Sequence, residues 1–450
     1  MVMGYTAPKA AIMERGRWKG NAMGTRRISW ITCLFVFMLA VGIVGFAVAA
    51  QSAAAAPQAT AQSVAASAPA KPSAKQLKAF KKASADFSLE LFQRCVAAKG
   101  KNANVTIAPM SVLNTMALAA NGAGGSTATQ LRDALGDGAS IARINKNLAW
   151  YNSKLTNSKK AKIRTANAIW YHDDGSIAMK KGFLKAAKKY YAAAVTPADF
   201  TDPATTTDVN AWVSKQTDGM IKKIVDRLDS DTRIAIVNAL YFDAKWQEPF
   251  EKDTVRTKTF TAANGKKHKV KMMFGTEHRY IEGEGVTGFV KPYAKGYSYV
   301  ALLPKKGTSV KKFVKGLDGD DFRALVAGAE HAEVHVAMPK YTITYSNDAM
   351  EQQLKDMGLS RAFGAKANFK KMAKSSEGPL YIDTVVHKTK IQVDENGTKA
   401  AAATGAMVKA GAALIGEVKK VTLNRPFVYA IVDNATDLPV FIGTVNNIGK

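Results

Sequence analysis

Three side chains on one short stretch are the best candidates for chemistry in this sequence: His331, Glu333 and His335. If the stretch is a strand, all three point to the same side, and imidazole and carboxylate groups are common zinc ligands. A strand face exposed to solvent produces the same alternation and is the more frequent origin of such a pattern. We therefore expect no metal here, and no cofactor is indicated elsewhere.

Motifs of hydrolases and metalloenzymes are missing. The sequence contains no His-Glu-x-x-His, no paired Cys-x-x-Cys and no Gly-x-Ser-x-Gly. Gly122, Gly124 and Gly125 lack the preceding strand and the spacing of a nucleotide-binding loop, so we predict that they form a turn. The protein is therefore not expected to be an enzyme.

A stretch of small residues stands out between a strand-like run, Tyr381 to Val393, and an apolar run that begins at Val421. Small or neutral side chains occur there at every second position: Thr398, Ala400, Ala402, Thr404, Ala406 and Val408. In an extended chain these six share one face, whereas Lys399 and Lys409 fall on the other. The stretch can therefore be buried as a strand without a steric penalty, although it offers no nucleophile, base or paired carboxylates.

Two polar residues interrupt strand-like apolar runs. Asn238 lies within the run from Ile234 to Phe242, and His387 lies in the run that starts at Val385. A buried polar group without a partner costs roughly 1–3 kcal/mol, so both side chains need hydrogen bonds. Each is explained by an ordinary partner in the core, or the two form one network with Ser111 that holds strands together. The sequence alone does not show whether they meet.

The composition suits a globular protein with a sizeable core, because 47% of the 450 residues are hydrophobic and 22% are charged. The formal net charge of +28 favours contact with a polyanion or an anionic membrane, or simply solubility. Two basic clusters contribute: Lys154, Lys159, Lys160, Lys162 and Arg164, then Lys180, Lys181, Lys185, Lys188 and Lys189. A solvated face is the simpler explanation, and a polyanion site is the open alternative.

The N-terminal part indicates export. Residues 1–29 are basic, and the uncharged apolar run 28–50 is typical of a secretory leader or a membrane anchor. Ala47-Val48-Ala49 matches the small residues of a cleavage site, so we expect a secreted protein, surface-anchored only if the leader is retained. Residues 51–74 are rich in Ala, Ser and Pro, which predicts a disordered linker before a folded part at 75–450. Cys33 and Cys95 do not form a plausible disulfide, and Cys95 is expected to be buried.

The folded part is expected to have mixed α and β structure with large sheets. Apolar residues at helical spacing predict a helix from Leu77 to Val96. The next predicted elements are a strand ending at Pro109, a helix capped by Ser111, a helix capped by Ser126 or Thr127, a strand at 162–170, helices at 183–194 and 207–225, and a strand at 233–242. From 260 to 432 we expect mostly strands, with short helices near Phe313 and at 349–357.

Several motifs occur in a distinctive order over about residues 75–450. They are Asn104-Val-Thr-Ile-Ala-Pro-Met-Ser-Val-Leu, Gly122-Ala-Gly-Gly-Ser-Thr, Val209-Asn-Ala-Trp-Val-Ser-Lys-Gln-Thr-Asp-Gly-Met-Ile, Ile236-Val-Asn-Ala-Leu-Tyr-Phe with Trp246 and Phe250, Met338-Pro-Lys-Tyr, His387-Lys-Thr, Glu395-Asn-Gly-Thr-Lys-Ala-Ala-Ala-Ala-Thr-Gly, and Asn424-Arg-Pro-Phe. Each is weak alone, but together, in this order and at this spacing, they specifically resemble the serpin family. Ala108 departs from the family, which usually has a serine there.

The resemblance implies a serpin fold with three β-sheets, eight or nine helices and an exposed reactive loop. In the family a protease cleaves this loop, and the loop then inserts as a new central strand while the protease remains covalently attached. The hinge of that loop would be Glu395, Gly397, Thr398, Ala400, Ala402 and Thr404. By resemblance Glu395 pairs with Lys340 near Trp246, and Ser111, Asn238 and His387 form the network that the separating strands rearrange.

The position of the scissile bond is less narrowly defined. Counting along the family loop from the hinge gives Gly411, whereas counting back from Pro426-Phe427 gives a residue near Ile415. The candidate residues are Lys409, Ala410, Gly411, Ala412, Ala413, Leu414 and Ile415. Ala412, Ala413 or Leu414 would suit an elastase- or subtilisin-like serine protease, which we favour over a trypsin-like enzyme that cuts after Lys409. The alternative function is a polyanion-binding scaffold that inhibits no protease.

Overall fold

A computed structural model describes residues 69–155, 161–347, 349–398 and 417–449. All of them belong to one compact unit, residues 66–450. Within these ranges no helix is long and apolar enough to cross a membrane. The expected leader at 1–50 and most of the expected linker at 51–74 lie outside the described residues, so both stay predictions.

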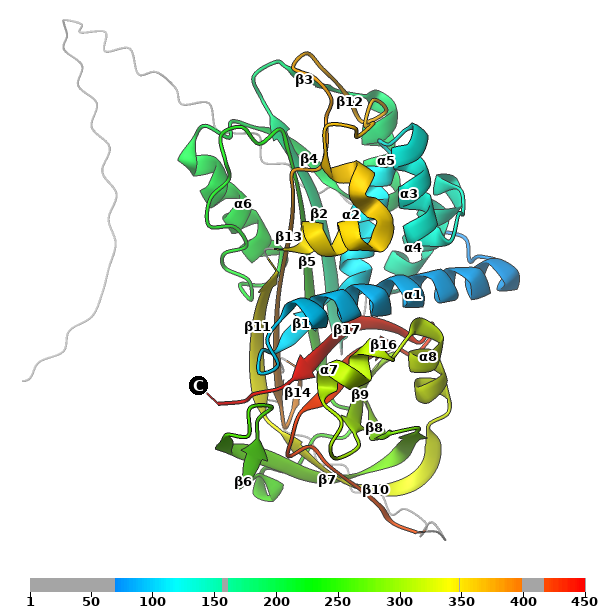
Figure 1. The fold of residues 1–450 in the computed structure, drawn as a ribbon, viewed down its shortest axis with the longest axis vertical. Coiled ribbons are helices and arrows are strands. Elements are labelled where there is room, and N and C mark those ends of the chain that lie inside the picture. Colours follow the sequence, from blue (N-terminus) through cyan, green and yellow to red (C-terminus); the bar gives the residue numbers. More distant parts are fainter. Residues whose placement is uncertain (1–68, 156–160, 348, 399–416, 450) are drawn as a thin grey trace, which may run out of the picture. The chain divides into compact units, whose positions relative to one another are not determined.

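Helices form mainly in the first half of the described chain (Figure 1). The described residues contain nine α-helices: α1 (Ala74–Ala98), α2 (Pro109–Ala120), α3 (Gly125–Gly136), α4 (Ile141–Leu155), α5 (Lys181–Tyr191), α6 (Pro203–Gln216), α7 (Val310–Lys315), α8 (Gly319–Ala327) and α9 (Met350–Leu354). A capping box between Ser73 and Gln76 starts α1, because each side chain bonds the backbone N–H of the other residue.

The largest sheet has nine strands. Its order is β1 (Val105–Ile107), β17 (Leu438–Val445), β16 (Phe427–Asp433), β9 (Tyr297–Pro304), β8 (Val286–Pro292), β7 (Lys267–Gly283), β10 (Glu330–Pro339) and β15 (Lys419–Thr422), and β6 (Arg256–Thr261) also pairs with β7. Only β10 and β15 run parallel; the other pairs are antiparallel. The first part of β7 pairs with β6, and its last residues pair with β8.

A second sheet has six strands and forms the centre of the molecule. Its order is β11 (Tyr341–Asn347), β13 (Thr384–Asp394), β14 (Gly397–Thr398), β5 (Ile234–Lys245), β2 (Ala161–His172) and β4 (Ala194–Ala198). Nearly every residue of β5 is buried, which fits its almost uninterrupted apolar sequence. A third sheet pairs β3 (Ile177–Met179) with β12 (Ala373–Ser375). The predicted mixed class, with three sheets and eight or nine helices, is confirmed.

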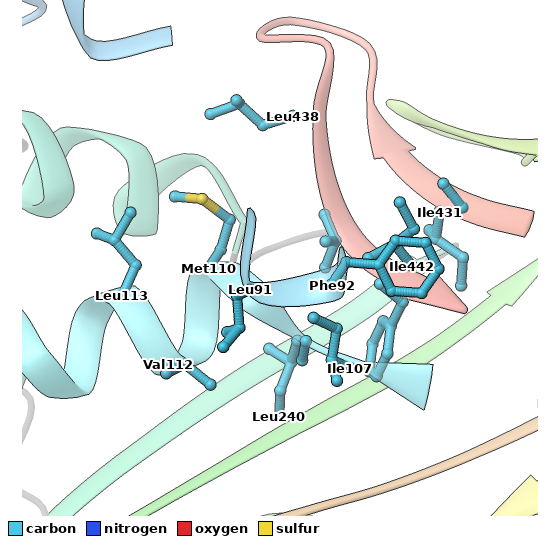
Figure 2. Packing of buried hydrophobic residues seen from close by; sticks show 14 of the residues in the cluster. Leu91, Phe92, Ile107, Met110, Val112, Leu113, Leu240, Ile431, Leu438 and Ile442 are labelled. Carbon is cyan, nitrogen blue, oxygen red and sulfur yellow. The ribbon is translucent and has the colours of Figure 1, made fainter. Parts of the chain in front are cut away.

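The main core lies where α1 and α2 pack between the two large sheets (Figure 2). Leu91 and Phe92 of α1 and Leu113 of α2 are fully buried there. Leu240 from the six-stranded sheet and Ile442 from the nine-stranded sheet complete the cluster shown. Full burial of such side chains stabilises the fold by about 1.5–3 kcal/mol each, so both sheets are fixed against the same two helices.

Several local predictions are wrong. Ser111 does not cap a helix: α2 starts at Pro109, whose fixed φ suits the first helical position, and Ser111 lies buried inside it. The cap of α3 is Gly124, not Ser126 or Thr127. The helix expected at 207–225 ends at Gln216, and α8 was not predicted. The burial of Cys95, in contrast, is confirmed.

Candidate reactive loop hinge

The short strand β14 lies between β13 and β5 at one end of the six-stranded sheet (Figure 1). Gly397 and Thr398 pair with Asp394 and Val393 on one side, and with Lys245 and Ala244 on the other. At the opposite end β13 and β5 pair directly and in parallel, and their described pairing stops at Val386. The two strands are thus joined at one end and separated by an inserted segment at the other.

Only a glycine fits at position 397. Its φ of 154° lies outside the range that other residues readily adopt. A Cβ atom there would lie 2.1 Å from the carbonyl oxygen of Ala244, far closer than van der Waals contact allows. The backbone of the hinge can therefore approach β5 only because residue 397 has no side chain.

Thr398 is seated in an aromatic pocket. Its side chain is 2% exposed, and its Oγ1 lies 2.6 Å from the hydroxyl of Tyr293. The ring of Tyr293 stacks on Trp246 with centroids 4.4 Å apart. Trp246 also donates from Nε1 to the carbonyl of Asp394 at 2.9 Å, and its backbone N–H donates to Asn396. The hinge is therefore held by both its side chain and its backbone.

Glu395 and Lys340 form the ion pair that the resemblance implies. Their Oε2 and Nζ atoms are 2.5 Å apart, and both side chains are mostly buried. Burial alone raises the pKa of Glu395, but the hydrogen bond and positive charge of Lys340 outweigh it, so this pKa lies below its usual value. Lys252 adds to the same effect from the start of the segment leading to β6. The pair joins the hinge to the end of β10.

A second buried ion pair supports this site and was not predicted. Lys291 Nζ lies 2.5 Å from Glu277 Oε1, and both side chains are almost completely buried. The same ammonium lies 4.3 Å from the ring centroid of Phe250 and 5.4 Å from that of Trp246. The sequence signal was weak, since Lys291 is a single cation in the mostly apolar strand β8.

Ser111, Asn238 and His387 do not form one hydrogen-bonded network. His387 Nε2 accepts from the backbone N–H of Ala108 at 3.2 Å, and Asn238 Nδ2 donates to Asn167 Oδ1 at 2.6 Å. Within the described residues, Ser111 Oγ and Asn238 Oδ1 have no hydrogen-bond partner. The expected network is therefore wrong in its connections, although all three side chains are buried.

Buried hydroxyl groups make the connections instead. Thr389 Oγ1 donates to the carbonyl of Thr106 at 2.7 Å, and Thr106 Oγ1 lies 2.8 Å from the hydroxyl of Tyr429. The hydroxyls of Tyr299 and Tyr341 are 3.0 Å apart in the same interior. Thr389 therefore links β13, and Tyr341 links β11, to the nine-stranded sheet.

Comparisons with known proteins show the family of this chain. The family model described as serpin (serine protease inhibitor) matches residues 82–448. The chain belongs to the serpin family. It is 31% identical to the uncharacterized serpin-like protein TK1782 of Thermococcus kodakarensis, over 80% of this chain and 84% of that protein. The crystal structure of the thermophilic serpin tengpin in the native state is 40% identical, has a TM-score of 0.78, and is matched over 84% of this chain and 95% of tengpin.

A more distant structure shares only the fold. Human thyroxine-binding globulin, solved with its ligand, is 22% identical with a TM-score of 0.75, over 83% of this serpin and 100% of that chain. Most serpins are protease inhibitors rather than enzymes, and serpins in general bind target proteases. Membership of the family therefore indicates proteases as the class of partner, but it does not identify a particular protease.

The rest of the predicted loop lies outside the described residues. This applies to the hinge residues Ala400, Ala402 and Thr404 and to the scissile candidates Lys409, Ala410, Gly411, Ala412, Ala413, Leu414 and Ile415. What the structure gives is the start of the loop at β14 and the point where the chain re-enters the fold at β15. The cleavage site accordingly stays a prediction.

The histidine stretch of this serpin does not form the expected uniform row. A register shift between His331 and Val334 breaks the alternation on β10. His335 Nε2 lies 3.0 Å from Glu333 Oε1, whereas His331 stacks on His278 with ring centroids 6.2 Å apart. In the described part of the chain, no three His, Cys, Asp or Glu side chains are placed to share a metal ion.

Proposed function

We propose that this serpin is an irreversible inhibitor of serine endopeptidases that acts by cleavage and insertion of its reactive loop. The observation that carries the proposal is the position of β14 between β13 and β5. A loop whose first residues already occupy the gap between two strands can continue to insert by adding further backbone pairs. Small side chains at Ala400, Ala402 and Thr404 suit burial in such a strand.

The chemistry belongs to the protease. Its serine oxygen attacks the carbonyl carbon of the scissile residue, the peptide C–N bond breaks, and an ester joins the enzyme to the N-terminal part of the loop. Insertion of that part as a strand moves the attached enzyme away before water hydrolyses the ester. This serpin therefore contributes a conformational change and no catalytic group. The ion pair between Glu395 and Lys340 lies at the end of the six-stranded sheet that must open for insertion.

We infer an elastase- or subtilisin-like target, because Ala412, Ala413 and Leu414 suit a shallow or apolar primary pocket. A trypsin-like target would cut after Lys409 and shorten the inserted arm. Mass spectrometry of the peptide released on mixing with both kinds of enzyme separates the two. Release of a peptide that begins at Ala410 would overturn the preference.

The test of inhibition is a covalent complex with protease that survives SDS. Thr398→Arg should form none and should be cleaved as a substrate, because a guanidinium would occupy the buried position beside Tyr293. Thr398→Ser keeps the hydroxyl and should still form the complex. If wild type is cleaved as a substrate at every ratio, the proposal is wrong.

The second candidate is a scaffold that binds polyanions and inhibits no protease. The fold alone does not imply inhibition, since the related thyroxine-binding globulin structure is a complex with thyroxine. The cluster at Lys180, Lys181, Lys185, Lys188 and Lys189 is exposed around α5, which favours this alternative. Salt-dependent retention on heparin without any covalent complex would support it.

We also propose secretion, with membrane attachment only if the leader is retained.

A further inference from the structure

The segment from Trp246 to Phe250 directly follows β5 and bonds the turn that precedes β14. Three consecutive carbonyl groups of this turn, at Asp394, Glu395 and Asn396, each accept a hydrogen bond from the segment. The donors are, in that order, Trp246 Nε1 at 2.9 Å, the Phe250 N–H at 2.9 Å and the Trp246 N–H at 3.0 Å. We call residues 246–250 the clamp, because they hold three carbonyl groups in a row.

The turn held by the clamp is the point where the chain reverses between β13 and β14. These two strands pair antiparallel, and Glu395 and Asn396 form the two-residue turn between them. In a hairpin the turn fixes the register of its two strands. Loop residues that insert beside β13 extend this hairpin, so the turn decides their register.

One buried cation contacts the clamp at three places. Lys291 Nζ donates to the carbonyl of Glu248 at 2.8 Å. The same atom lies 4.3 Å from the ring centroid of Phe250 and 5.4 Å from that of Trp246. The Lys291 side chain is 4% exposed, so these contacts are not weakened by water. Because they fall on the first, third and last residues of the clamp, a single ammonium group fixes the whole segment.

Both β7 and β8 contribute to this support. Glu277 of β7 is the counter-ion of Lys291, and its side chain is 7% exposed. A buried cation without such a partner would be strongly destabilising. The ring of Phe250 also lies close to the backbone of β7, since a Cβ atom on Gly275 would be 3.0 Å from it. The clamp is therefore attached to two strands of the nine-stranded sheet, outside the sheet that receives the loop.

We propose that Lys291, with Glu277 as its counter-ion, is a positioning residue that holds the hairpin turn in place while the loop inserts. This role rests on the proposed inhibitory function, because it concerns the rate of insertion. Lys340 binds the side chain of Glu395 directly, whereas Lys291 acts on the backbone of the turn through the clamp. At this end β13 and β5 are already separated by β14, so the clamp can stay bonded to the turn during insertion.

The expected effect follows from a competition between two rates. Insertion of the cleaved loop competes with hydrolysis of the ester that joins the loop to the protease. A turn that is fixed beforehand offers the incoming residues one register, which makes productive pairing faster. Without the ammonium group of Lys291 the clamp holds the turn less firmly. Insertion then slows, and more of the serpin is released as cleaved product.

The test compares the full chain with a variant that carries Lys291→Met and Glu277→Gln together, so that no buried charge is left unpaired. Pancreatic elastase should cleave the loop of both proteins at the same rate, because the loop itself is unchanged. The ratio of cleaved free serpin to covalent complex should rise about tenfold in the variant, which corresponds to about 1.4 kcal/mol in the barrier to insertion.

Hydrogen exchange measures the clamp without any protease. The backbone amides of Trp246 and Phe250 donate to the turn, so they should exchange at least about tenfold faster in the variant. The matched control carries Lys81→Met and Asp437→Asn, which removes the ion pair between α1 and the turn after β16. Asparagine tolerates the positive φ of residue 437. This control should match wild type in both measurements.

The outcomes separate this role from the proposed function. Unchanged exchange at Trp246 and Phe250, or an unchanged ratio of cleaved serpin to complex, would overturn the role of Lys291. An equal rise of the ratio in the Lys81 control would also overturn it, because the effect would then be general destabilisation. A wild type that forms no covalent complex would instead overturn the proposed function, while faster exchange in the Lys291 variant would still show that Lys291 holds the clamp.

Discussion

His387 shows at the scale of one residue how burial sets a pH dependence. Its ring is almost fully buried in β13, and burial lowers its pKa from 6.5 to about 4. Its Nε2 accepts a hydrogen bond from the backbone of Ala108, which only the neutral ring can do. Since the unfolded chain binds the proton more tightly, stability is full above pH 6.5 and is lost as the pH falls toward 4.

We predict that lowering the pH from 7 to 4.5 destabilises wild type by about 2 kcal/mol more than His387→Gln, given about 1.4 kcal/mol for each pKa unit. Glutamine can accept the same hydrogen bond without titrating. Urea unfolding midpoints of both proteins at the two pH values measure the difference. Equal losses in the two proteins would show that carboxyl groups elsewhere, not His387, set the acid limit.

The sequence predicts which polar residues are buried better than it predicts their partners. Asn238 and His387 were identified because each interrupts an apolar run, and both are buried. The partner of Asn238 is Asn167, which is 71 residues away and comes opposite only through the register of β2 with β5. Ser111 was grouped with them as one possible network, and its Oγ has no hydrogen-bond partner within the described residues. Hydrogen-bond partners depend on strand register, which no local pattern contains.

At the scale of the element, β14 depends on one glycine. We predict that Gly397→Ala displaces β14 from the sheet, because the added Cβ would collide with the carbonyl of Ala244. Backbone amides of the hinge should then exchange with solvent at least about tenfold faster, since exchange follows local opening. Hydrogen exchange with mass spectrometry of peptides that cover 393–398 measures this.

The control for this variant is Gly182→Ala in α5, where an added Cβ has no atom within 4 Å and φ is not positive. It should leave the hinge peptides unchanged. If Gly397→Ala also leaves them unchanged, β14 is not held by its close approach to β5. Loss of protection throughout the sheet would instead indicate general destabilisation.

Helix ends were predicted less well than helix positions. The helix expected at 207–225 ends at Gln216, because Asp218 and Gly219 adopt left-handed conformations with φ of 48° and 74°. The dipeptide Asp218-Gly219 is typical of a turn, but the apolar periodicity around it was given more weight in predicting the helix. The start of β14 was likewise not predicted. Alternating small residues indicate a strand, but they do not show how many of its residues pair with β13 and β5 before cleavage.

At the scale of the whole molecule, the two large sheets are fixed to the same helices while β13 and β5 remain separated at one end. A loop that is still connected to β15 cannot fill the gap far beyond Thr398 without pulling that strand away. Cleavage anywhere between residues 409 and 415 would remove this restraint. Each new ladder hydrogen bond then adds roughly 0.5–1.5 kcal/mol, set against the cost of ordering the chain.

We therefore predict that wild type cleaved within 409–415 unfolds at a temperature at least about 10 °C above that of the intact protein, as several kcal/mol of added stability would produce. Calorimetry of the protein before and after loop cleavage by a protease that forms no covalent complex with it measures the change. Cleaved Thr398→Arg should show little increase over its own intact form, because the guanidinium blocks insertion at the buried position beside Tyr293. An equal increase in both proteins would mean that cleavage stabilises the fold without strand insertion, and no increase in either would mean that the loop does not insert.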